Sequence, residues 1–501
     1  MHFLEMIFIG DRMDNLEGKK ISAGLAENLT LFGDIFKKDK ILRIREFTGG
    51  KENPIPCAVL FIDGMVNSQI LNESIVRPVL LCDGKTGDLS PADYIIKRVL
   101  FAAEAAKKSC VSDILRGLLY GDSVLLLDNC TEALVINTKG WRTRGISEPN
   151  DERVLQGPRE GFDESVMLNL AMIRRRLPTP DLCVETATVG RRTDTFVFIC
   201  YLDSLVNKRV LKELKKRLEK IDIDGILDSN YISELITSAP FSPLKTIGST
   251  ERPDIVAARL LEGRVAVMVD GTPVVLTLPY LFSENFQSDD DYYLNFIVAG
   301  MGRILRYICF FLSISVPALY LALITTHRSL LPTALAISIS SARNGVPFPS
   351  IIECISLIGI FEILRETGIR MPQSVGHALS IVGGLVVGQA AVEAKIVSAP
   401  MLIIVALSGI AGLMLPRLKG IVSYGRIILV LLAHIWGLFG YLTGIAALLI
   451  LIFSLNSFGV DYTSSLSSIS PQSIKDTLVR APWRNMKTRP QGISNNRTRK
   501  V

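Results

Sequence analysis

Charged residues are concentrated toward the two ends of the chain and leave long apolar stretches between them. Residues 307–326, 396–416 and 427–460 contain no Asp, Glu, Lys or Arg. A helix that crosses the hydrocarbon core of a bilayer needs about 20 consecutive, mostly apolar residues, a length that buried soluble helices seldom reach. The pattern therefore predicts a helical, polytopic membrane domain over residues 291–460, preceded by a soluble region.

The soluble region contains two matching strand patterns. The apolar runs 56–63 and 196–203 have the length of strands buried on both faces, and both end in Asp-x-x-Val-Asn after an offset of 140 residues. A second match has an offset of 142: Leu-Leu-x-Gly at 118–121 and 260–263 precedes a short apolar run that ends in Asp128 or Asp270. We interpret these strand-end aspartates as turn residues.

These two matches predict an α/β fold class for the soluble region, with tandem domains that are two copies of a similar unit. The alternative is two unrelated strand–helix units with similar ends. The expected boundaries are an N-terminal helical leader (1–50), soluble domain 1 (51–140), a linker and helix (141–179), soluble domain 2 (180–290), the membrane domain (291–460) and a basic C-terminal tail (461–501).

Within these domains, local signals predict individual elements. Residues 79–82 are expected to form a strand and residues 92–107 a helix. Residues 123–127 and 133–136 are expected to form a hairpin, and Asp163 is expected to cap a helix that ends at Arg176.

The membrane domain carries charged residues at unusual places. Its first span is expected at 303–326, and segment 331–371 is apolar but contains the acidic residues Glu353, Glu362 and Glu366, with a Pro-Phe-Pro break at 347–349. Charged side chains and broken helices at membrane depth require a protein-lined or water-lined setting. We interpret the segment as part of an ion path, and the alternative is an amphipathic helix at the interface.

Segment 376–394 is rich in small residues. Gly384 and Gly388 form a G-x-x-x-G pattern that lets helices approach closely. The segment could line a pore that is constricted by three apolar side chains, or it could serve helix packing only. The candidate constriction residues are Leu379, Val382 and Val386.

Positive charges constrain the topology. The 416–426 loop and the C-terminal tail are both rich in Lys and Arg, which favours the cytoplasmic side for both. A helical hairpin or broken pair around Gly437, Gly440 and Gly444 would reconcile the two, whereas a single crossing would not.

A cluster of arginines precedes and opens the second soluble domain. These side chains form a solvated face, or they make interdomain or intersubunit salt bridges, or they contact anionic headgroups. The cluster consists of Arg159, Arg174, Arg175, Arg176, Arg191 and Arg192. Farther along, Asp289–Asp291 with Tyr292, Tyr293 and Phe296 indicates the place where the chain enters the membrane.

Composition excludes several functions. The net charge of +6 over 501 residues does not indicate nucleic-acid binding. Eight cysteines without CxxC spacing and four isolated histidines indicate neither a zinc site nor a disulfide framework. The sequence contains no P-loop, dinucleotide-binding, G-x-S-x-G or HExxH motif, so we expect no cofactor, metal or catalytic residues, and no enzyme. Met1–Gly10 lacks the basic flank of a signal peptide, which places the soluble region on the cytoplasmic side.

Several motifs between residues 150 and 415 carry a family resemblance. They include Gly-Pro-Arg-Glu-Gly-Phe at 157–162, Arg-Asn-Gly-Val-Pro-Phe-Pro at 343–349 and Ser-Ile-Val-Gly-Gly-Leu-Val-Val-Gly-Gln-Ala-Ala at 380–391. In these motifs the chain resembles the A subunit of bacterial spore germinant receptors, the GerA spore germination protein family. Asn344 stands where many members have an acidic residue.

The resemblance implies a location, partners and a role. Such subunits lie in the spore inner membrane as oligomers, with a B-type transporter-like nutrient-sensing subunit and a C-type lipoprotein, and their soluble region faces the spore core. The implied function is a nutrient-gated ion channel component that releases monovalent cations and triggers germination. A scaffold or signalling subunit without its own pore and a secondary transporter are the alternatives, and no inverted repeat is visible in the membrane half to favour the transporter.

Overall fold

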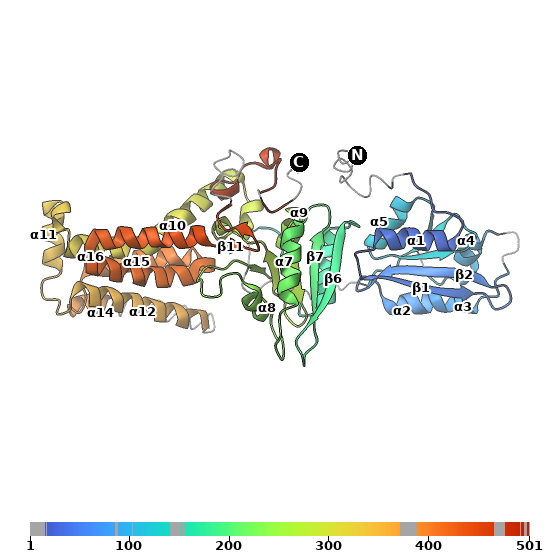
Figure 1. The fold of residues 1–501 in the computed structure, drawn as a ribbon, viewed down its shortest axis with the longest axis horizontal. Coiled ribbons are helices and arrows are strands. Elements are labelled where there is room, and N and C mark those ends of the chain that lie inside the picture. The colour runs from blue at the N-terminus through green and yellow to red at the C-terminus, as the bar shows by residue number, and fades with distance from the viewer. Residues whose placement is uncertain are drawn as a thin grey trace.

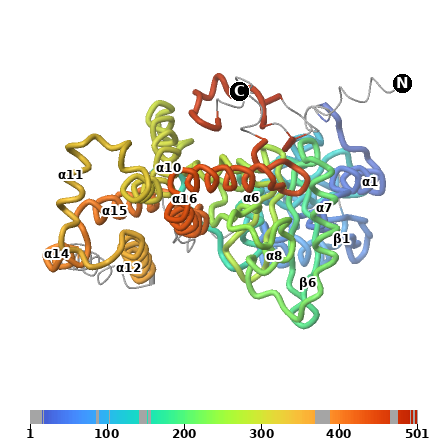
Figure 2. The backbone as a smooth tube through the Cα atoms, turned by 60° about the vertical axis from the view of Figure 1, so that its left-hand side comes forward, coloured from blue at the N-terminus to red at the C-terminus, as the bar shows by residue number. Residues whose placement is uncertain are grey.

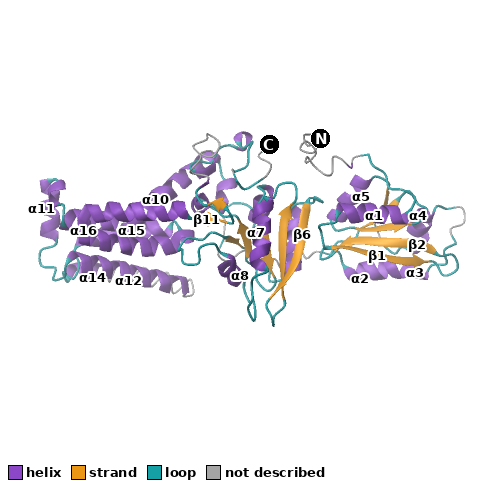
Figure 3. Cartoon of the chain, viewed as in Figure 1, coloured by secondary structure: helices purple, strands orange, loops and turns teal. Residues whose placement is uncertain are grey.

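The computed structural model describes residues 16, 18–85, 89–102, 104–140, 152, 156–370, 388–464, 476–490, 492–494 and 498–499. The described chain is elongated, with a sheet-containing unit at one end, a second such unit in the middle and a bundle of long helices at the other end (Figure 1). Strands and helices both make up the first two parts, whereas the third is helical (Figure 3).

The first α/β unit, residues 25–136, has one five-stranded sheet of order β1-β2-β4-β5-β3 in which every neighbouring pair is antiparallel. Its strands are β1 (Leu42–Gly49), β2 (Ile55–Ile62), β3 (Ala105–Lys108), β4 (Ser123–Leu127) and β5 (Ala133–Ile136). Its helices are α1 (Leu25–Ile35), α2 (Ser68–Ile70), η2 (Leu71–Val76), α3 (Arg77–Leu81), α4 (Pro91–Tyr94), η3 (Ile95–Val99) and α5 (Val111–Leu119).

The second α/β unit, residues 166–278, has the same strand order, β6-β7-β9-β10-β8, again with antiparallel neighbours. Its strands are β6 (Leu182–Val189), β7 (Thr195–Leu202), β8 (Gly248–Thr250), β9 (Val265–Val269) and β10 (Val275–Leu278). Its helices are α6 (Val166–Arg176), α7 (Lys208–Leu218), α8 (Ser229–Ile236) and α9 (Pro253–Leu261).

In both units, an asparagine side chain makes two hydrogen bonds to the backbone of the segment that precedes the first helix, and we call this arrangement an asparagine lock. In the first unit the Asn28 amide donates to the carbonyl oxygen of Ser22 at 2.7 Å and accepts from its backbone N–H at 2.9 Å. In the second unit Asn169 makes the same pair of bonds with Asp163, at 2.5 and 2.7 Å. Both amides are buried, so each lock satisfies polar groups that would otherwise be costly.

The strand-end aspartates hold the same two helices. Asp128, just after β4, accepts from the backbone N–H of Leu25 at 3.1 Å, and Asp270, just after β9, accepts from that of Val166 at 3.1 Å. Each carboxylate therefore satisfies a free N–H in the first turn of a helix that is distant in sequence.

Four local predictions were wrong. Residues 79–82 lie largely in helix α3, because a short apolar run does not distinguish a buried strand from a buried helix. The expected helix at 92–107 ends at Val99 and is followed by β3, and the expected leader contains strand β1, which pairs with β2. Asp163 does not cap α6, since its N-cap is Ser165 and its first N–H binds Asp270.

The two units share one hydrophobic core. Buried side chains of α1 and α5 from the first unit and of α6 and α9 from the second belong to one continuous cluster. Arg174 of α6, with 1% of its side chain exposed, pairs with Asp39 of the first unit, which is 3% exposed. The backbone N–H of Lys40 also donates to the carbonyl oxygen of Val184 in β6 at 3.3 Å. These contacts join the units across the sequence boundary.

The helical bundle consists of α10 (Phe296–Thr325), α11 (Thr333–Ala342), α12 (Ser350–Arg370), α14 (Gly388–Glu393), α15 (Ala399–Leu413) and α16 (Lys419–Ser454). Helix α10 and the segment 416–454 are long and apolar enough to cross a membrane, with mean hydropathy of 2.2 each. Only 28% of the apolar window of the second segment is buried inside the chain, unlike the core helix of a soluble protein. The bundle therefore exposes large apolar faces.

Helix α16 is a hairpin and not one continuous helix. Gly437 has a left-handed backbone, with φ +61° and ψ −138°, at which the helix breaks. A Cβ on Gly440 would lie 2.0 Å from the carbonyl oxygen of Leu432, and one on Gly425 would lie 3.6 Å from Leu448. A straight helix would separate the second pair by more than about 30 Å, so the arms fold back on each other. The turn lies where the glycine pattern predicted it.

After the hairpin the chain returns to the second α/β unit. The Ser457 hydroxyl donates to the carbonyl oxygen of Thr246 at 2.6 Å. Farther on, Ser494 forms a β-bridge with Val206 and its hydroxyl donates to the carbonyl oxygen of Leu205 at 2.8 Å. In the first unit the equivalent Val66 bridges to Lys139. The C-terminal residues therefore lie over the second unit, as the red end of the tube shows (Figure 2).

Candidate functional site

A buried ion-pair cluster fixes the start of α10. The guanidinium of Arg303, fully buried, donates to Asp291 at 2.8 Å and to the Asp476 carboxylate at 2.9 Å. Arg306, one turn later, also binds Asp291, at 3.0 Å through both of its terminal nitrogens. The Tyr292 ring lies 5.4 Å from the Arg303 guanidinium. Asp291 is thus neutralised by two arginines of the helix itself, and Arg303 also binds the C-terminal tail.

A second ion-pair cluster holds the loop between α15 and α16. Arg417 donates to Asp289 at 2.9 Å and to Glu152, in the segment between the two α/β units, at 3.4 Å. Glu152 in turn accepts from the Thr250 hydroxyl at 2.5 Å. Burial, together with the charge of Asp289, raises the pKa of Glu152. Arg417 thus links the helical bundle to the soluble region.

A third ion-pair cluster connects α9 and β9 to the same acidic segment. Glu284 is buried and accepts from Arg264 at 2.5 Å, and Arg259 pairs with it as well. Burial lowers the pKa of Arg264 to about 10. Because breaking a buried pair leaves an uncompensated charge, the segment 284–291 is rigidly attached to the second unit.

The three ion-pair clusters all involve carboxylates of the segment 284–291, and we refer to them together as the junction. It binds the second α/β unit to the start of α10, to the α15–α16 loop and to the tail. A rotation or shift of the second unit would therefore move the helices, since interfaces of this kind rearrange as discrete states and do not stretch.

The acidic residues of α12 lie along one helix but have different surroundings. Glu353, in its first turn, is 1% exposed and accepts from the backbone N–H of Ser398 at 2.6 Å and from its hydroxyl at 2.5 Å. Arg343 lies 3.8 Å from its other oxygen. Glu353 therefore also satisfies the first turn of α15.

The other two acidic residues face the first arm of α16. Glu362 pairs with Arg365 and accepts from the Ser423 hydroxyl at 3.0 Å, while Glu366 pairs with Lys419 at 2.7 Å. Arg426, one turn beyond Ser423, is fully buried, and none of its three guanidinium nitrogens has a hydrogen-bond partner within the described chain. The bundle thus contains a concentration of charge between α12 and α16.

Comparison with known proteins identifies the family to which this chain belongs. The sequence profile described as "Bacillus/Clostridium GerA spore germination protein" matches residues 30–492. The chain is 40% identical over 476 residues to spore germination protein KA of Bacillus subtilis (strain 168), covering 95% of this chain and 87% of that one. It is 36% identical over 438 residues to spore germination protein GerLA of Bacillus cereus, covering 87% and 89%. The chain belongs to the GerA spore germination protein family.

Among solved structures, the GerA-family chain is similar to the N-terminal domain of the A subunit of the Bacillus megaterium spore germinant receptor GerK3. That match is 35% identical, covers 53% of this chain and 98% of the other, and has a TM-score of 0.41. The family profile and the curated relatives confirm the family resemblance inferred from the motifs at 150–415.

The candidate constriction of this GerA-family chain is not described. Leu379, Val382, Val386 and Gly384 all lie outside the described residues. Gly388 opens α14, and a Cβ at this position would lie 3.7 Å from Leu402 of α15, an ordinary packing distance. The pore and helix-packing roles of this segment stay predictions.

The predicted basic cluster is divided among several sites. Arg174 joins the two α/β units through Asp39, while Arg175 and Arg176 both bind Glu160, at 2.6 and 2.7 Å. Two members lie on the exposed turn between β6 and β7: Arg191 pairs with Asp222 at 2.5 Å and Arg192 with Asp224 at 4.0 Å. Arg159 is exposed.

Sequence reasoning missed the central arginines of the junction. Arg303 appeared only as a residue that opens the first span, and its partner Asp476 lies 173 residues away. The available signal was the pairing of three aspartates before the helix with two arginines at its start. That signal indicates charge compensation but does not identify the tail as a participant.

Proposed function

We propose that this chain is the A subunit of a nutrient-responsive spore germinant receptor and its oligomeric, ligand-gated ion channel component. In this proposal it lies in the spore inner membrane, with a B-type transporter-like nutrient-sensing subunit and a C-type lipoprotein as partners. Opening releases monovalent cations and starts germination. Membership of the GerA family supports the receptor role.

The observation that carries the channel proposal is the junction. Arg303, Arg264 and Arg417 bind one acidic segment from the start of α10, from the second α/β unit and from the α15–α16 loop. A conformational change in the soluble region can therefore reach several helices together, as a gate requires. The concentration of charge between α12 and α16 supports an ion path in the same bundle.

We propose that Glu353, Glu362 and Glu366 attract cations to this path and that Leu379, Val382 and Val386 constrict it. Acidic rings raise the local cation concentration, and apolar constrictions close a pore by dewetting. The exposed apolar faces of the bundle supply surfaces through which copies of the chain can surround such a pore.

We also propose that the soluble region faces the spore core. Arg417 and Lys419 lie at the end of the bundle next to the soluble units, and the positive-inside rule places such loops on the cytoplasmic side. The α16 hairpin supports the same side for the basic tail, because its second arm returns the chain to the second unit.

The shared strand order, the paired asparagine locks and the paired helix-holding aspartates support the proposal that the α/β units are tandem copies of one unit. We further propose that the chain is not an enzyme. Turnover of a nucleotide or lipid by the purified chain would contradict this last proposal.

Ion flux through liposomes tests the channel. The chain is reconstituted together with its B-type and C-type partners, and potassium release is measured with and without nutrient. Val382→Ala should raise the leak and Val382→Trp should abolish nutrient-triggered release. Ile44→Ala, at a side chain that is 38% exposed in β1 of the first α/β unit and far from the bundle, is the control and should leave release unchanged.

The outcomes separate the alternatives. If release is present and neither Val382 variant changes it, the proposed constriction is wrong. If the complete receptor and the alanine variant are both tight while nutrient still binds, the chain is a scaffold or signalling subunit. Accumulation of a solute against its gradient would identify a secondary transporter.

A further inference from the structure

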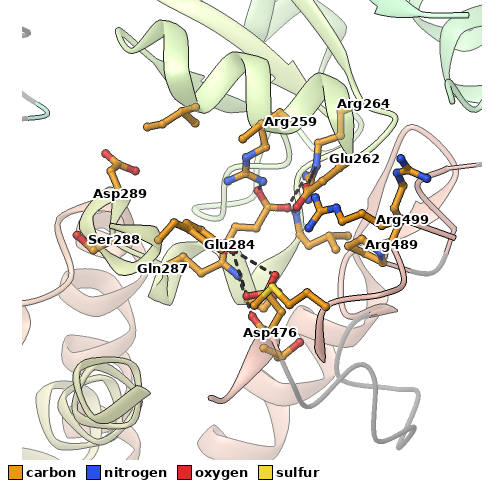
Figure 4. A pocket seen from close by; sticks show the side chains of 18 of the residues that line it. Arg259, Glu262, Arg264, Glu284, Gln287, Ser288, Asp289, Asp476, Arg489 and Arg499 are labelled. Atoms are coloured by element: carbon orange, nitrogen blue, oxygen red, sulfur yellow. Dashed lines mark hydrogen bonds and ion pairs between the residues drawn. The ribbon is translucent and has the colours of Figure 1, made fainter. Parts of the chain in front are cut away.

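A cavity of about 440 Å³ lies beside the junction, between α9, the acidic segment 281–293 and the C-terminal tail. Figure 4 shows its arginine-rich wall, where side chains from α9, the following strand and the tail point toward one another. This volume falls in the range of about 300–1,000 Å³ that is typical of small-molecule sites. Neither the proposed ion path nor the resemblance to relatives gives the cavity a role.

The described wall contains five arginines and five carboxylates, but two of the carboxylates, Asp254 and Asp476, pair with arginines outside the wall. Around the carboxylates of Glu262 and Glu284 lie four guanidinium groups, so this part of the wall has an excess of two positive charges. The four arginines are Arg259, Arg264, Arg489 and Arg499.

Each remaining carboxylate of the wall has an arginine partner, although two of these arginines lie outside the wall. Asp289 is held by Arg417, and Asp476 by Arg303. Asp254 pairs with Arg252 at 2.8 Å and accepts from the Tyr293 hydroxyl at 2.5 Å. These acids therefore do not offset the excess.

The two tail arginines provide that excess. Arg489 donates to the carbonyl oxygen of Leu261 at 2.8 Å, and the guanidinium of Arg499 lies 5.9 Å from the Trp483 ring. Burial and the neighbouring charge of Arg499 lower the pKa of Arg489. Mutual repulsion of this kind is relieved when an anion binds between the two groups.

The cavity lies at the level of the membrane surface. Its wall includes Tyr292, Tyr293 and Trp483, residues of the type that gather at membrane interfaces. Just beyond it, the first turns of α10 expose Ile297 (58%) and Met301 (68%), a surface suited to acyl chains. A basic recess at this depth beside a spanning helix is the type of place that receives an anionic lipid headgroup.

We propose that this cavity binds the phosphate group of an anionic phospholipid headgroup, with Arg489 and Arg499 as its main ligands and the acyl chains along the start of α10. The headgroup would then tie the C-terminal tail to the membrane surface and to the second α/β unit.

The test is native mass spectrometry of the delipidated full-length chain in detergent, titrated separately with phosphatidylglycerol and with phosphatidylcholine of the same chain length. Wild type should bind phosphatidylglycerol in preference. Arg489→Gln/Arg499→Gln should bind it roughly thirtyfold more weakly, since each of the two basic residues contributes about fivefold in affinity. The control Arg43→Gln/Arg45→Gln removes the same charges from exposed positions of β1 in the first unit and should bind as wild type does.

A second variant tests whether weaker binding arises only because the double substitution disrupts the tail. Ala258 lines the cavity on α9 but is exposed, so Ala258→Glu adds a negative charge without removing a tail contact. It should weaken binding as well. Equal binding of phosphatidylglycerol by wild type, Ala258→Glu and the double tail variant would overturn the proposal. Displacement of the lipid by millimolar inorganic phosphate, or equal uptake of phosphatidylcholine, would overturn the lipid headgroup as the source.

Discussion

The ion pair between Arg174 and Asp39 offers the sharpest test of how the two α/β units are held together. Both side chains are almost completely buried, at 1% and 3% exposure, and Arg174 also reaches the carbonyl oxygen of Leu182 at 3.4 Å. Arg174→Met keeps most of the side-chain volume and leaves the Asp39 carboxylate buried without its counter-charge.

The expected magnitude follows from that burial. Removing one partner of a buried ion pair costs about 3–5 kcal/mol, because an uncompensated charge stays in the protein interior. Replacing both partners by apolar side chains of similar size is often neutral or stabilising by about 1–4 kcal/mol. Arg174→Met should therefore destabilise the soluble region strongly, and Arg174→Met/Asp39→Leu should recover the stability of wild type or exceed it.

The pH dependence has a definite sign. Burial raises the pKa of Asp39 above its ordinary value of 3.8, although Arg174 partly offsets the effect. A carboxyl group with a raised folded-state pKa contributes stability that is present below the unfolded pKa and lost as the pH rises through the folded pKa. Relative to Asp39→Asn, which does not titrate, wild type should lose stability as the pH rises from about 4 toward neutrality.

Buried thiols supply the assay. Cys200 in β7 is fully buried near Arg174, and burial raises the pKa of its thiol to about 12, so it reacts with a thiol-reactive dye only after unfolding. In a chain whose other seven cysteines are replaced by alanine, dye fluorescence during heating in detergent then reports the melting of the soluble region. Arg192, which pairs with Asp224 on the surface, is the control. Arg192→Met should change the stability by no more than about 0.5 kcal/mol.

Two results would refute this reasoning. One is that Arg174→Met melts together with wild type, which would mean that the pair does not stabilise the interface between the units. The other is that the double variant melts no later than Arg174→Met, and the loss would then come from packing and not from the unpaired charge.

Three other changes test other parts of the molecule. Gly440→Ala places a Cβ against the opposite arm of the α16 hairpin and should lower the yield of folded chain, at a cost of about 1–3 kcal/mol. Gly359→Ala, at a position with open space around it, should leave the yield unchanged. Detergent-phase gel filtration compares the two variants. Arg303→Lys keeps the buried charge but cannot bind Asp291 and Asp476 in the same fork geometry; it should uncouple nutrient from ion release in the reconstituted receptor while leaving assembly intact, as co-purification would verify. Deletion of residues 487–501 should expose the bridge position at Val206 and destabilise the second unit by about 1–2 kcal/mol, measured by the same thiol assay.

Elements with one dominant signal could be predicted from the sequence. The continuous apolar runs gave strands β2 and β7 within one residue of their ends, and the hairpin at 123–127 and 133–136 is confirmed. The glycines around 437 correctly located the turn of the α16 hairpin. In each place the local pattern and the tertiary environment agree.

Other features depended on distant partners and could not be predicted. Residues 79–82 have the composition of a strand, but their position beside the first sheet makes them helical. The partners of Arg303 and Arg174 lie 173 and 135 residues away, so no local pattern identifies them. The cavity likewise needs α9 and the tail side by side, a contact that only the completed fold creates.

The bridge between Val206 and Ser494 has a consequence for biosynthesis. The first α/β unit fills the equivalent position with Lys139, which follows directly in the chain, so it can finish folding soon after it leaves the ribosome. The second unit must wait for residues that are translated after every helix of the bundle. This contact therefore forms only after Ser494 has been synthesised, and a product truncated before it leaves the position at Val206 open.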